Sequence, residues 1–406
     1  MNEKKNERYL LSAVFLFWFS VYTYPSFLTT YVTDTLGAAK VLAGTIVGSY
    51  GLTQMILRIP LGIMSDVLKK RKLFVMIGFV LSIISSAGLS IIAFLAGRES
   101  VPEGLAYGVL IFRGISGMMA ATWVNFSVLY ASSYEGDQVT KAMSRIIVPQ
   151  CGSQIIAMLL GAWLAGNLGE IWAFLLATAA GILGLLVMIK VKEQAPEGEP
   201  MTIKGFLEVA KNRQLITGTA LAAIYQLVVW ATVQGFVQNW AKEVIGFTTA
   251  SLGLLSVANL LPSTIFSHFS GTVLAPKLGR RAVLTAGFLA IAGACFLYPK
   301  TQSVFFLLMV QALLGAGVGL IMPLTMASAI ETVPNEKRGA AMGIYQALYG
   351  VGMFIGPVLG GFIIEKFGGE GSSLVPVQGY VANFYAAMII ALIGAVFPFI
   401  LSRKRA

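Results

Sequence analysis

Arg113 is the residue whose chemistry can be read most directly from the sequence. It lies inside a long apolar stretch, and an arginine costs about 2.5–3.5 kcal/mol to insert into a hydrocarbon core, where it generally faces a cavity or a partner. All 18 Asp and Glu residues fall at the ends of the apolar stretches or between them, so no acidic partner is evident. The counter-charge could be a substrate carboxylate or phosphate, bound bidentately. The alternative is a structural arginine, bound to backbone carbonyls and side-chain amides of neighbouring helices.

Two other ionisable residues lie within apolar stretches. Arg58 is about two helical turns from the end of its stretch, and snorkelling to the lipid headgroups accounts for it. His268 is the only histidine and could titrate near neutral pH, so it is a candidate for proton coupling, with a packed histidine as the alternative. A single histidine excludes a multi-histidine metal site, and we expect neither a metal nor a cofactor. Cys151 and Cys295 both lie in apolar stretches, so they form no disulfide framework.

Amide and aromatic side chains recur inside the same apolar stretches. Gln226, Trp230 and Gln234 follow one another at steps of four residues, which places them on one face of a helix. Buried amides need hydrogen-bond partners, and a polar cavity supplies them. The alternative is that such residues hold helices together. We predict that the set lines a substrate path with Arg113; its members are Trp18, Tyr22, Gln150, Gln154, Gln226, Trp230, Gln234, Gln311, Tyr345, Gln346 and Tyr349.

The elements that must position these residues are membrane helices. Of the 406 residues, 57% are hydrophobic and 12% are charged, whereas soluble domains have about 25% charged residues. Stretches of about 20 apolar residues cross a bilayer as helices, and these stretches lack the two-residue alternation of membrane strands. The sequence therefore predicts an all-α membrane protein. Its twelve spans are expected at 10–33, 41–65, 73–97, 105–131, 142–167, 170–190, 214–240, 250–275, 282–298, 303–330, 338–364 and 378–402.

The basic residues indicate how the spans are oriented. Most of the 29 Lys and Arg residues lie on one side of the spans, in segments such as 69–72, 277–281 and 403–405. Because cytoplasmic loops carry an excess of Lys and Arg, we expect both termini in the cytoplasm, in a bacterial inner membrane. The net charge of +11 is spread over short loops, so it does not indicate nucleic-acid binding.

The sequence divides into two halves of six spans. We expect one six-helix bundle at 1–190, a cytoplasmic linker at 191–213 and a second six-helix bundle at 214–406, which is a pseudo-symmetric arrangement. Both halves carry a basic loop after their second span, at 62–72 and 275–281, and a glycine-rich fourth span. Many secondary transporters are built from such repeats, with a binding site at the interface between them.

Several short motifs resemble those of the major facilitator superfamily. Gly62, Asp66 and Arg71 fit its cytoplasmic loop signature, although Lys69 stands where the family usually has a second glycine. In the second copy of this loop, Pro276 occupies the position of the aspartate. The other matches are Arg113 with Gly117 in the fourth span, the segment 333–339, and the glycines from Gly343 to Gly361 in the eleventh span.

The resemblance implies roles for particular residues. Asp66, with Gly62 and Arg71, would help to close a cytoplasmic gate against the start of the eleventh helix, where Arg338 lies. Spans one, four, seven and ten would line the path. Many drug–proton antiporters of the family carry a Gly-Pro motif in the fifth span, and this sequence lacks that pair in its fifth span.

These observations predict a secondary transporter that moves a small organic solute, preferably an organic anion, by alternating access. One alternative is an efflux pump for lipophilic drugs, because the aromatic residues suit apolar ligands too. Another is a non-transporting relative that acts as a membrane sensor or assembly partner. The spans hold no cluster of acidic, histidine or cysteine residues that could perform chemistry, so we do not expect an enzyme. The expected partners are the solute and the lipid bilayer, and we expect a monomer.

Overall fold

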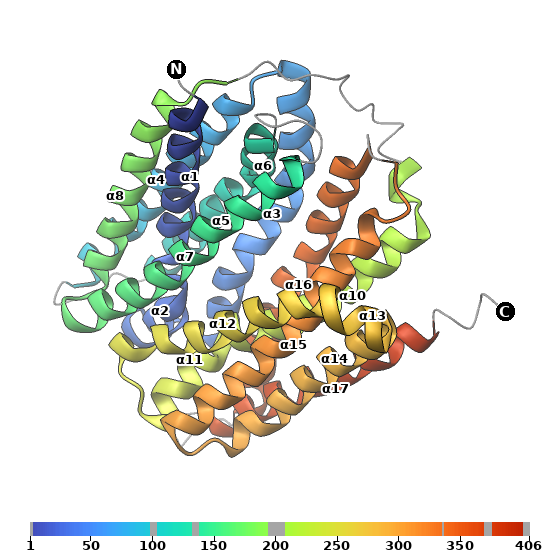
Figure 1. The fold of residues 1–406 in the computed structure, drawn as a ribbon. Coiled ribbons are helices and arrows are strands. Elements are labelled where there is room, and N and C mark those ends of the chain that lie inside the picture. The colour runs from blue at the N-terminus through green and yellow to red at the C-terminus, as the bar shows by residue number, and fades with distance from the viewer. Residues whose placement is uncertain are drawn as a thin grey trace.

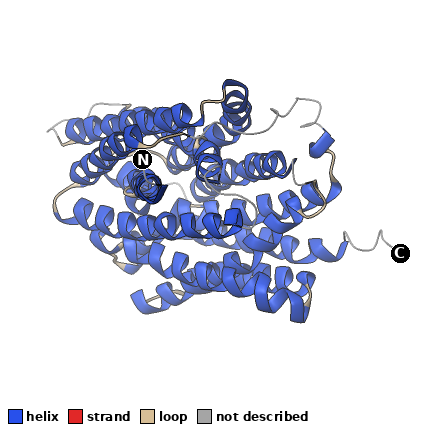
Figure 2. Ribbon diagram, turned by 45° about the horizontal axis from the view of Figure 1, so that its top comes forward, coloured by secondary structure: helices blue, strands red, loops and turns tan. Residues whose placement is uncertain are grey.

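The computed structural model describes residues 3–97, 104–131, 138–193, 208–334, 337–368 and 376–400. Over these ranges the chain is helical and contains no strand (Figure 2). Twelve helical segments are long and apolar enough to cross a membrane, which confirms the predicted fold class and the number of spans. The boundaries differ by a few residues; the first span, for example, runs over Lys4–Thr35 and so begins earlier than expected.

The helices of the first half are α1 (Glu3–Tyr22), α2 (Pro25–Thr30), η1 (Tyr31–Thr35), α3 (Lys40–Leu68), α4 (Arg71–Ala96), α5 (Leu105–Ala121), α6 (Trp123–Ala131), α7 (Gln138–Asn167) and α8 (Glu170–Lys190). Those of the second half are α10 (Arg213–Ala231), η2 (Thr232–Phe236), α11 (Val237–Trp240), η3 (Ala241–Ile245), η4 (Thr249–Ser251), α12 (Gly253–Phe269), η5 (Ser270–Leu274), α13 (Ala275–Leu278), α14 (Arg280–Leu297), η6 (Tyr298–Lys300), α15 (Val304–Ile330), α16 (Arg338–Phe367) and α17 (Val377–Ile400).

The two halves lie side by side, the first drawn blue to green and the second yellow to red (Figure 1). They meet chiefly where α3 packs against α16 and where α7 packs against α12 and η4. The predicted boundaries of the bundles stay a prediction, because residues 194–207 of the expected linker lie outside the described residues. We call the side on which α1 begins and α17 ends the termini side, and the opposite side the far side.

Two of the spans are interrupted close to the middle of the molecule. The first span stops at Tyr22 and resumes at Pro25, which occupies the first turn of α2. Proline suits that position because its missing N–H would have no partner there. The seventh span changes from α-helix to π-helix at Thr232–Phe236. Such local changes in helical winding are frequent at functional sites, and these two bring backbone of both halves to the same place.

On the far side the two halves are packed backbone against backbone. A Cβ atom added to Gly44 of α3 would lie 2.0 Å from the carbonyl oxygen of Pro357 in α16, and one added to Gly361 would lie 2.3 Å from that of Lys40. Between α7 and η4, a Cβ atom on Gly166 would lie 2.3 Å from the backbone nitrogen of Ala250. Only glycine permits these approaches, so the far side is closed.

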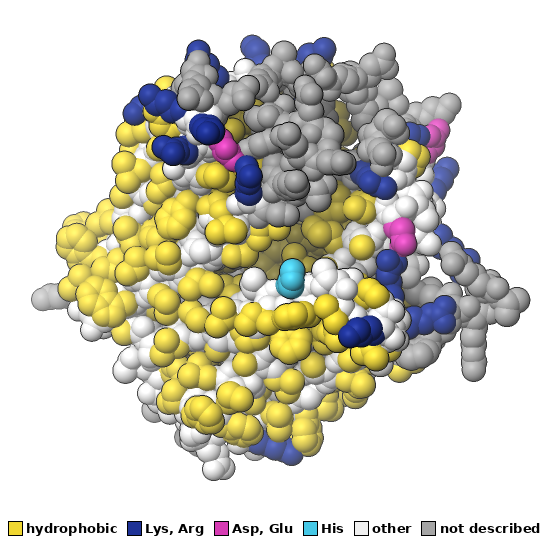
Figure 3. All heavy atoms as spheres, viewed as in Figure 1, with side chains coloured by type: hydrophobic (Ala, Val, Ile, Leu, Met, Phe, Trp, Pro, Cys, Tyr) yellow, Lys and Arg dark blue, Asp and Glu magenta, His cyan; other side chains and the backbone are white. Residues whose placement is uncertain are grey.

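The termini side is open by comparison. Val67 and Leu68 at the end of α3 are exposed, and Val148 of α7 is 73% exposed. Figure 3 shows a hollow between the two halves, with the single histidine at its edge. The molecule is therefore in a conformation that is closed on the far side and opens toward the termini side.

Candidate functional site

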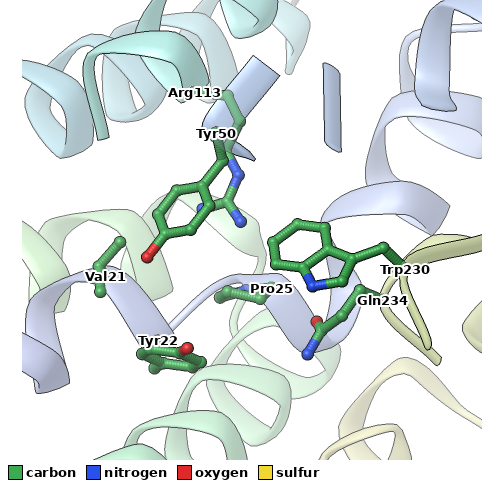
Figure 4. Close-up of a pocket in the computed structure, with 7 residues that line it drawn as sticks. All are labelled: Val21, Tyr22, Pro25, Tyr50, Arg113, Trp230 and Gln234. Atoms are coloured by element: carbon green, nitrogen blue, oxygen red, sulfur yellow. The ribbon is translucent and has the colours of Figure 1, made fainter. Parts of the chain in front are cut away.

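A small cavity lies where the two halves meet. The volume open to the centre of a water molecule is about 10 Å³, which is room for about one water. The lining residues come from α1, α2, α3 and α5 of the first half and from α10 and η2 of the second, and Figure 4 shows them around the gap; they are Val21, Tyr22, Pro25, Tyr50, Arg113, Trp230 and Gln234. The cavity is too small for an organic solute in this conformation, so a bound solute requires the two halves to move apart.

Arg113 provides the charge of this cavity. Its side chain is 3% exposed, and its guanidinium carbon lies 4.4 Å from the ring centroid of Tyr50 and 5.4 Å from that of Tyr24. Its Nη1 donates a long hydrogen bond of 3.4 Å to Ser116 Oγ, and its Nε has no hydrogen-bond partner among the described residues. Cation–π contacts hold the guanidinium group in place without neutralising its charge. Arg113 thus keeps hydrogen-bonding capacity for a further group.

Tyr50 joins the two halves across the cavity, and the sequence analysis missed it. Its ring stacks on that of Trp230 with the centroids 5.7 Å apart and an interplanar angle of 15°. A signal was available, because Tyr50, Gln54 and Arg58 follow one another at steps of four and so share one helical face.

Five of the predicted path residues gather around this cavity. Arg113, Tyr22, Trp230 and Gln234 line it directly. Trp18 lies one turn before Tyr22, with ring centroids 5.6 Å apart. The first, second, fourth and seventh spans therefore supply side chains to this cavity, and their role in a substrate path stays a prediction.

Other predicted residues lie elsewhere at the interface. The hydroxyl groups of Tyr345 and Thr325 are 2.8 Å apart, and the ring of Tyr349 lies 5.4 Å from that of Tyr345. Tyr225 of α10 also hydrogen-bonds to Tyr345, so these residues form a cluster of hydroxyl groups within the second half. A further set is buried or half-buried without lining the small cavity, and its members are Gln150, Gln154, Gln226 and Gln346.

Gln311 and His268 are placed away from the small cavity. Gln311 is fully buried within the second half, where its Oε1 accepts a hydrogen bond of 3.1 Å from the Tyr298 hydroxyl. His268 is exposed in the last turn of α12, and its ring lies edge-on to that of Phe269 with the centroids 5.5 Å apart. The proposed coupling role of His268 stays a prediction.

The predicted gate residues lie at the termini side. A Cβ atom added to Gly62 of α3 would have Val124 of α6 within 4 Å, at 3.8 Å, and Arg71 begins α4. Arg338 begins α16 and is exposed. The backbone of Asp66 is part of α3, but its side chain lies outside the described residues. The gate stays a prediction.

Ion pairs between the two halves close the far side, and the sequence analysis did not find them. Lys40 Nζ of α3 lies 2.8 Å from Glu243 Oε1 of η3, and Lys242 Nζ lies 2.8 Å from Asp34 Oδ2 of η1. The Tyr380 hydroxyl donates to Glu243 at 2.9 Å. The uneven distribution of Lys and Arg between the two sides of the spans could have pointed to these pairs. Lys40 and Lys242 are among the few basic residues on the side that is poor in Lys and Arg.

Uncharged groups reinforce this closure. Asn239 Nδ2 donates to Thr33 Oγ1 at 2.8 Å and to Glu243 Oε1 at 3.2 Å. The backbone N–H of Val41 donates to Glu365 Oε1 of α16 at 2.8 Å. These hydrogen bonds join residues of η1, α3, α11, η3 and α16 on the far side.

A central polar cavity between two bundles of six membrane helices is the arrangement of one large transporter family, and the comparisons with known proteins agree. The sequence model of the Major Facilitator Superfamily matches residues 10–248 and 219–406, which together cover nearly the whole chain. The chain belongs to the major facilitator superfamily. It is an integral membrane transporter rather than an enzyme.

Two relatives align with most of this superfamily member, and a third aligns with less than a third of it. An uncharacterized MFS-type transporter of Methanocaldococcus jannaschii is 23% identical over 378 residues, which are 87% of this chain and 92% of the relative. The inner membrane transport protein YajR of Escherichia coli is 26% identical over 357 residues, 85% of this chain and 74% of YajR. The quinolone resistance protein NorA of Staphylococcus aureus is 29% identical over 121 residues, 30% of this chain and 31% of NorA.

Solved structures share the fold. A bacterial homologue of the human lysosomal transporter Spinster, in an inward-facing and occupied conformation, superposes with a TM-score of 0.75 at 15% identity, covering 98% of this chain and 96% of the homologue. A variant of the nucleoside transporter NupG gives a TM-score of 0.74 at 14% identity, covering 97% of this chain and 100% of NupG. At these identities the likeness concerns the fold alone.

Proposed function

We propose that this transporter moves small organic anions by alternating access and binds them through Arg113. The observation that carries the proposal is the state of that side chain. It lines the cavity between the halves, is 3% exposed, and has a cation–π environment with no carboxylate in contact among the described residues. A carboxylate or phosphate would satisfy its free donors and neutralise its charge.

The remaining lining residues suit an organic anion with an apolar or hydroxylated body. Trp230 and Tyr50 offer flat apolar surfaces, and Gln234 and Tyr22 offer hydrogen-bonding groups. Ligand sites in proteins combine such apolar walls with a few polar groups that fix orientation. A few hundred Å³ are needed for a small organic ligand, so the halves would separate around Arg113 to admit it and close again behind it.

We infer that the termini side is the cytoplasmic side of a bacterial inner membrane. The excess of basic residues on the termini side supports this orientation, as does the relative YajR, which is named an inner membrane transport protein. The conformation is then open to the cytoplasm, as in the inward-facing Spinster homologue. We propose that the monomer is the transporting unit, with bundles at 1–190 and 214–406 joined by the linker 191–213.

Uptake by proteoliposomes tests the proposal. Vesicles containing the purified protein are supplied with a panel of radiolabelled small carboxylates and phosphate esters, alongside fluorescent lipophilic dyes. We expect uptake of one class of anion and a loss of at least about tenfold in Arg113→Gln, because a charge-assisted hydrogen bond contributes about 1.5–3 kcal/mol. Arg113→Lys should retain part of the flux, since it keeps the charge and loses the bidentate geometry. Dye flux that is independent of anions and unaffected in Arg113→Gln would refute the proposal.

A second candidate function is the efflux of lipophilic drugs. Two relatives favour it: the quinolone resistance protein NorA, and the multidrug transporter protein MdtP of Bacillus subtilis, which is 29% identical over 160 residues. The aromatic rings of Trp18, Tyr50 and Trp230 could also bind an apolar compound. The assay above separates the two candidates, because drug efflux predicts dye transport that depends on Trp230 and not on Arg113.

A further inference from the structure

Arg58 is a second arginine buried in the membrane-spanning region, and it does not snorkel. The sequence analysis placed its guanidinium group among lipid headgroups, but the side chain is 3% exposed, so that interpretation was wrong. Its Nε and Nη1 atoms have no hydrogen-bond partner among the described residues. A buried guanidinium with two unused donors is costly, and such groups call for a specific explanation.

Arg58 lies on the face of α3 that reaches the central cavity. Tyr50, Gln54 and Arg58 are one turn apart, and Tyr50 lines the cavity. Gln54 is 5% exposed, and its Oε1 also lacks a hydrogen-bond partner among the described residues. Long side chains on a helix lean toward its N-terminus, so we expect the Arg58 side chain to extend toward Gln54. Two buried polar side chains with unpartnered atoms therefore lie on the face of α3 that carries Tyr50.

Tyr50 relates the two arginines in space. Its ring centroid lies 4.4 Å from the guanidinium carbon of Arg113, and Arg58 follows it by two turns on the same face of α3. The described carboxylates that take part in ion pairs or hydrogen bonds, such as Asp34, Glu243 and Glu365, lie at the ends of helices. Among the described side chains, no carboxylate is paired with Arg58 or Arg113, and the side chain of Asp66 lies outside the described residues.

We propose that Arg58 is a second anion-binding residue of the transport path and that the transported solute carries two negative charges. One negatively charged oxygen of the solute binds Arg113 at the cavity, and another binds Arg58 with help from the Gln54 amide on the termini side of Tyr50. The two oxygens belong to separate carboxylates in a dicarboxylate and to one phosphoryl group in a phosphate monoester. Both like charges are then neutralised by the solute, which explains why the path tolerates them. This inference rests on the proposed function and names its substrate class.

The test compares dianions with matched monoanions by calorimetric titration of the purified full-length protein in detergent. Succinate is compared with monomethyl succinate, and phenyl phosphate with methyl phenyl phosphate, which also separates dicarboxylates from phosphate esters. For at least one pair, we expect the wild type to bind the dianion at least about tenfold more tightly than the monoanion. In Arg58→Gln, the ratio of dianion affinity to monoanion affinity should fall to about one, and the monoanion affinity should stay within about threefold of the wild type. Arg113→Gln should weaken the binding of both ligands. Arg213→Gln, which removes an exposed arginine at the start of α10, is the matched control and should leave the ratio unchanged.

The outcomes separate the two ideas. A wild type without dianion preference, or an unchanged ratio in Arg58→Gln, overturns the inference and leaves the role of Arg113 intact. The proposed function itself is overturned if the wild type binds none of the tested anions, or if Arg113→Gln binds them as tightly as the wild type does. If Arg58→Gln does not fold, Arg58→Met is used, which also removes the charge and keeps an unbranched side chain, and an unchanged ratio there overturns the inference. The wild type offers a check without mutation: affinity for phenyl phosphate should fall as the solution is acidified through pH 6, where a phosphate monoester loses its second charge.

Discussion

The two ends of the interface between α3 and α16 differ in their packing although the same two helices form both. At the far end, an added Cβ atom on Gly44 would lie 2.0 Å from the Pro357 oxygen, and one on Gly361 would lie 2.3 Å from the Lys40 oxygen. At the termini end, an added Cβ atom on Gly62 would meet only Val124, at 3.8 Å, and one on Gly343 would meet nothing within 4 Å. Glycine therefore occurs at both ends, but only the far end uses it in this conformation.

The charged groups repeat this contrast. The ion pairs Lys40–Glu243 and Lys242–Asp34 on the far side join the two halves. The described pairs on the termini side stay within one half or reach toward the linker, and they are Arg145–Glu7, Arg280–Glu331 and Lys337–Glu208. The comparison teaches that one end is held closed by specific contacts while the other is free to close. A glycine surface on both ends of one helix pair is what a structure that alternates between two closures requires.

The largest expected effect comes from filling the glycine contact at the far end. Gly44→Leu places a side chain where backbone of α16 lies, so the far side cannot close as it does here. Moving a two-state equilibrium from 99:1 to 1:99 takes about 5.5 kcal/mol, and a backbone clash of this size can supply it. We expect transport to fall at least about tenfold. In a cysteine-free background, Thr29→Cys on α2, which is buried here, should react with an impermeant maleimide added from the far side.

Gly343→Leu is the matched variant at the other end. Gly343 lies seven residues before Gly350, so it shares the face of α16 that packs on α3, but it has open space in this conformation. We expect this variant to leave Thr29→Cys as unreactive as in the parent, because it disfavours only closure of the termini side. If Thr29→Cys reacted with the maleimide equally fast in the Gly44→Leu and Gly343→Leu backgrounds, the view that the two glycines serve closure of opposite sides would be contradicted.

The helices and their number were predictable from the sequence because hydropathy alone determines which segments enter a bilayer. The position of Arg113, Trp230 and Gln234 at a cavity was predictable because polar groups inside apolar stretches need a cavity or a partner. Contacts between the halves were not, since the pairing of Lys40 with Glu243 joins residues 203 positions apart. The burial of Arg58 was missed for the same reason: its distance from a helix end is visible in the sequence, but the helices that cover it are not.

Weakening the ion pair at the far end should have an intermediate effect. Lys40 and Glu243 have side chains 15% exposed each, and Glu243 also accepts from Tyr380. Glu243→Gln removes the charge and keeps the shape, so we expect a loss of about 1.5–3 kcal/mol of far-side closure. This corresponds to a roughly ten- to hundredfold faster modification of Thr29→Cys. Lys242→Gln breaks the more exposed pair with Asp34 and should change the rate less than about fivefold. A larger effect of Lys242→Gln than of Glu243→Gln would reverse this assignment.

The smallest expected effect compares the turns at the two ends of α3. Both turns contain a residue in the left-handed region: Gly37 before the helix has φ of +64°, and Lys69 after it has φ of 51°. Holding a residue with a Cβ atom in the left-handed region costs roughly 1–2 kcal/mol, and glycine avoids this cost. Glycine also raises the conformational entropy of the unfolded chain, which offsets part of the gain in stability. We expect Lys69→Gly to stabilise the protein by about 0.5–1 kcal/mol, measured as a rise in Tm in detergent. Gly37→Lys should destabilise it by about the same amount.

Lys69 also contributes a positive charge to the basic loop, and the effect of charge must be separated from that of the backbone. Lys69→Asn removes the charge but tolerates the left-handed region better than lysine, whereas Lys70→Gly removes a neighbouring charge at a residue with φ of −129°. If backbone strain is the cause, Lys69→Asn should recover part of the stabilisation and Lys70→Gly none of it. Equal stabilisation by Lys69→Gly and Lys70→Gly would instead assign the effect to mutual repulsion among Lys69, Lys70 and Arg71. The backbone strain at the open end of α3 would then be no greater than that at its closed end.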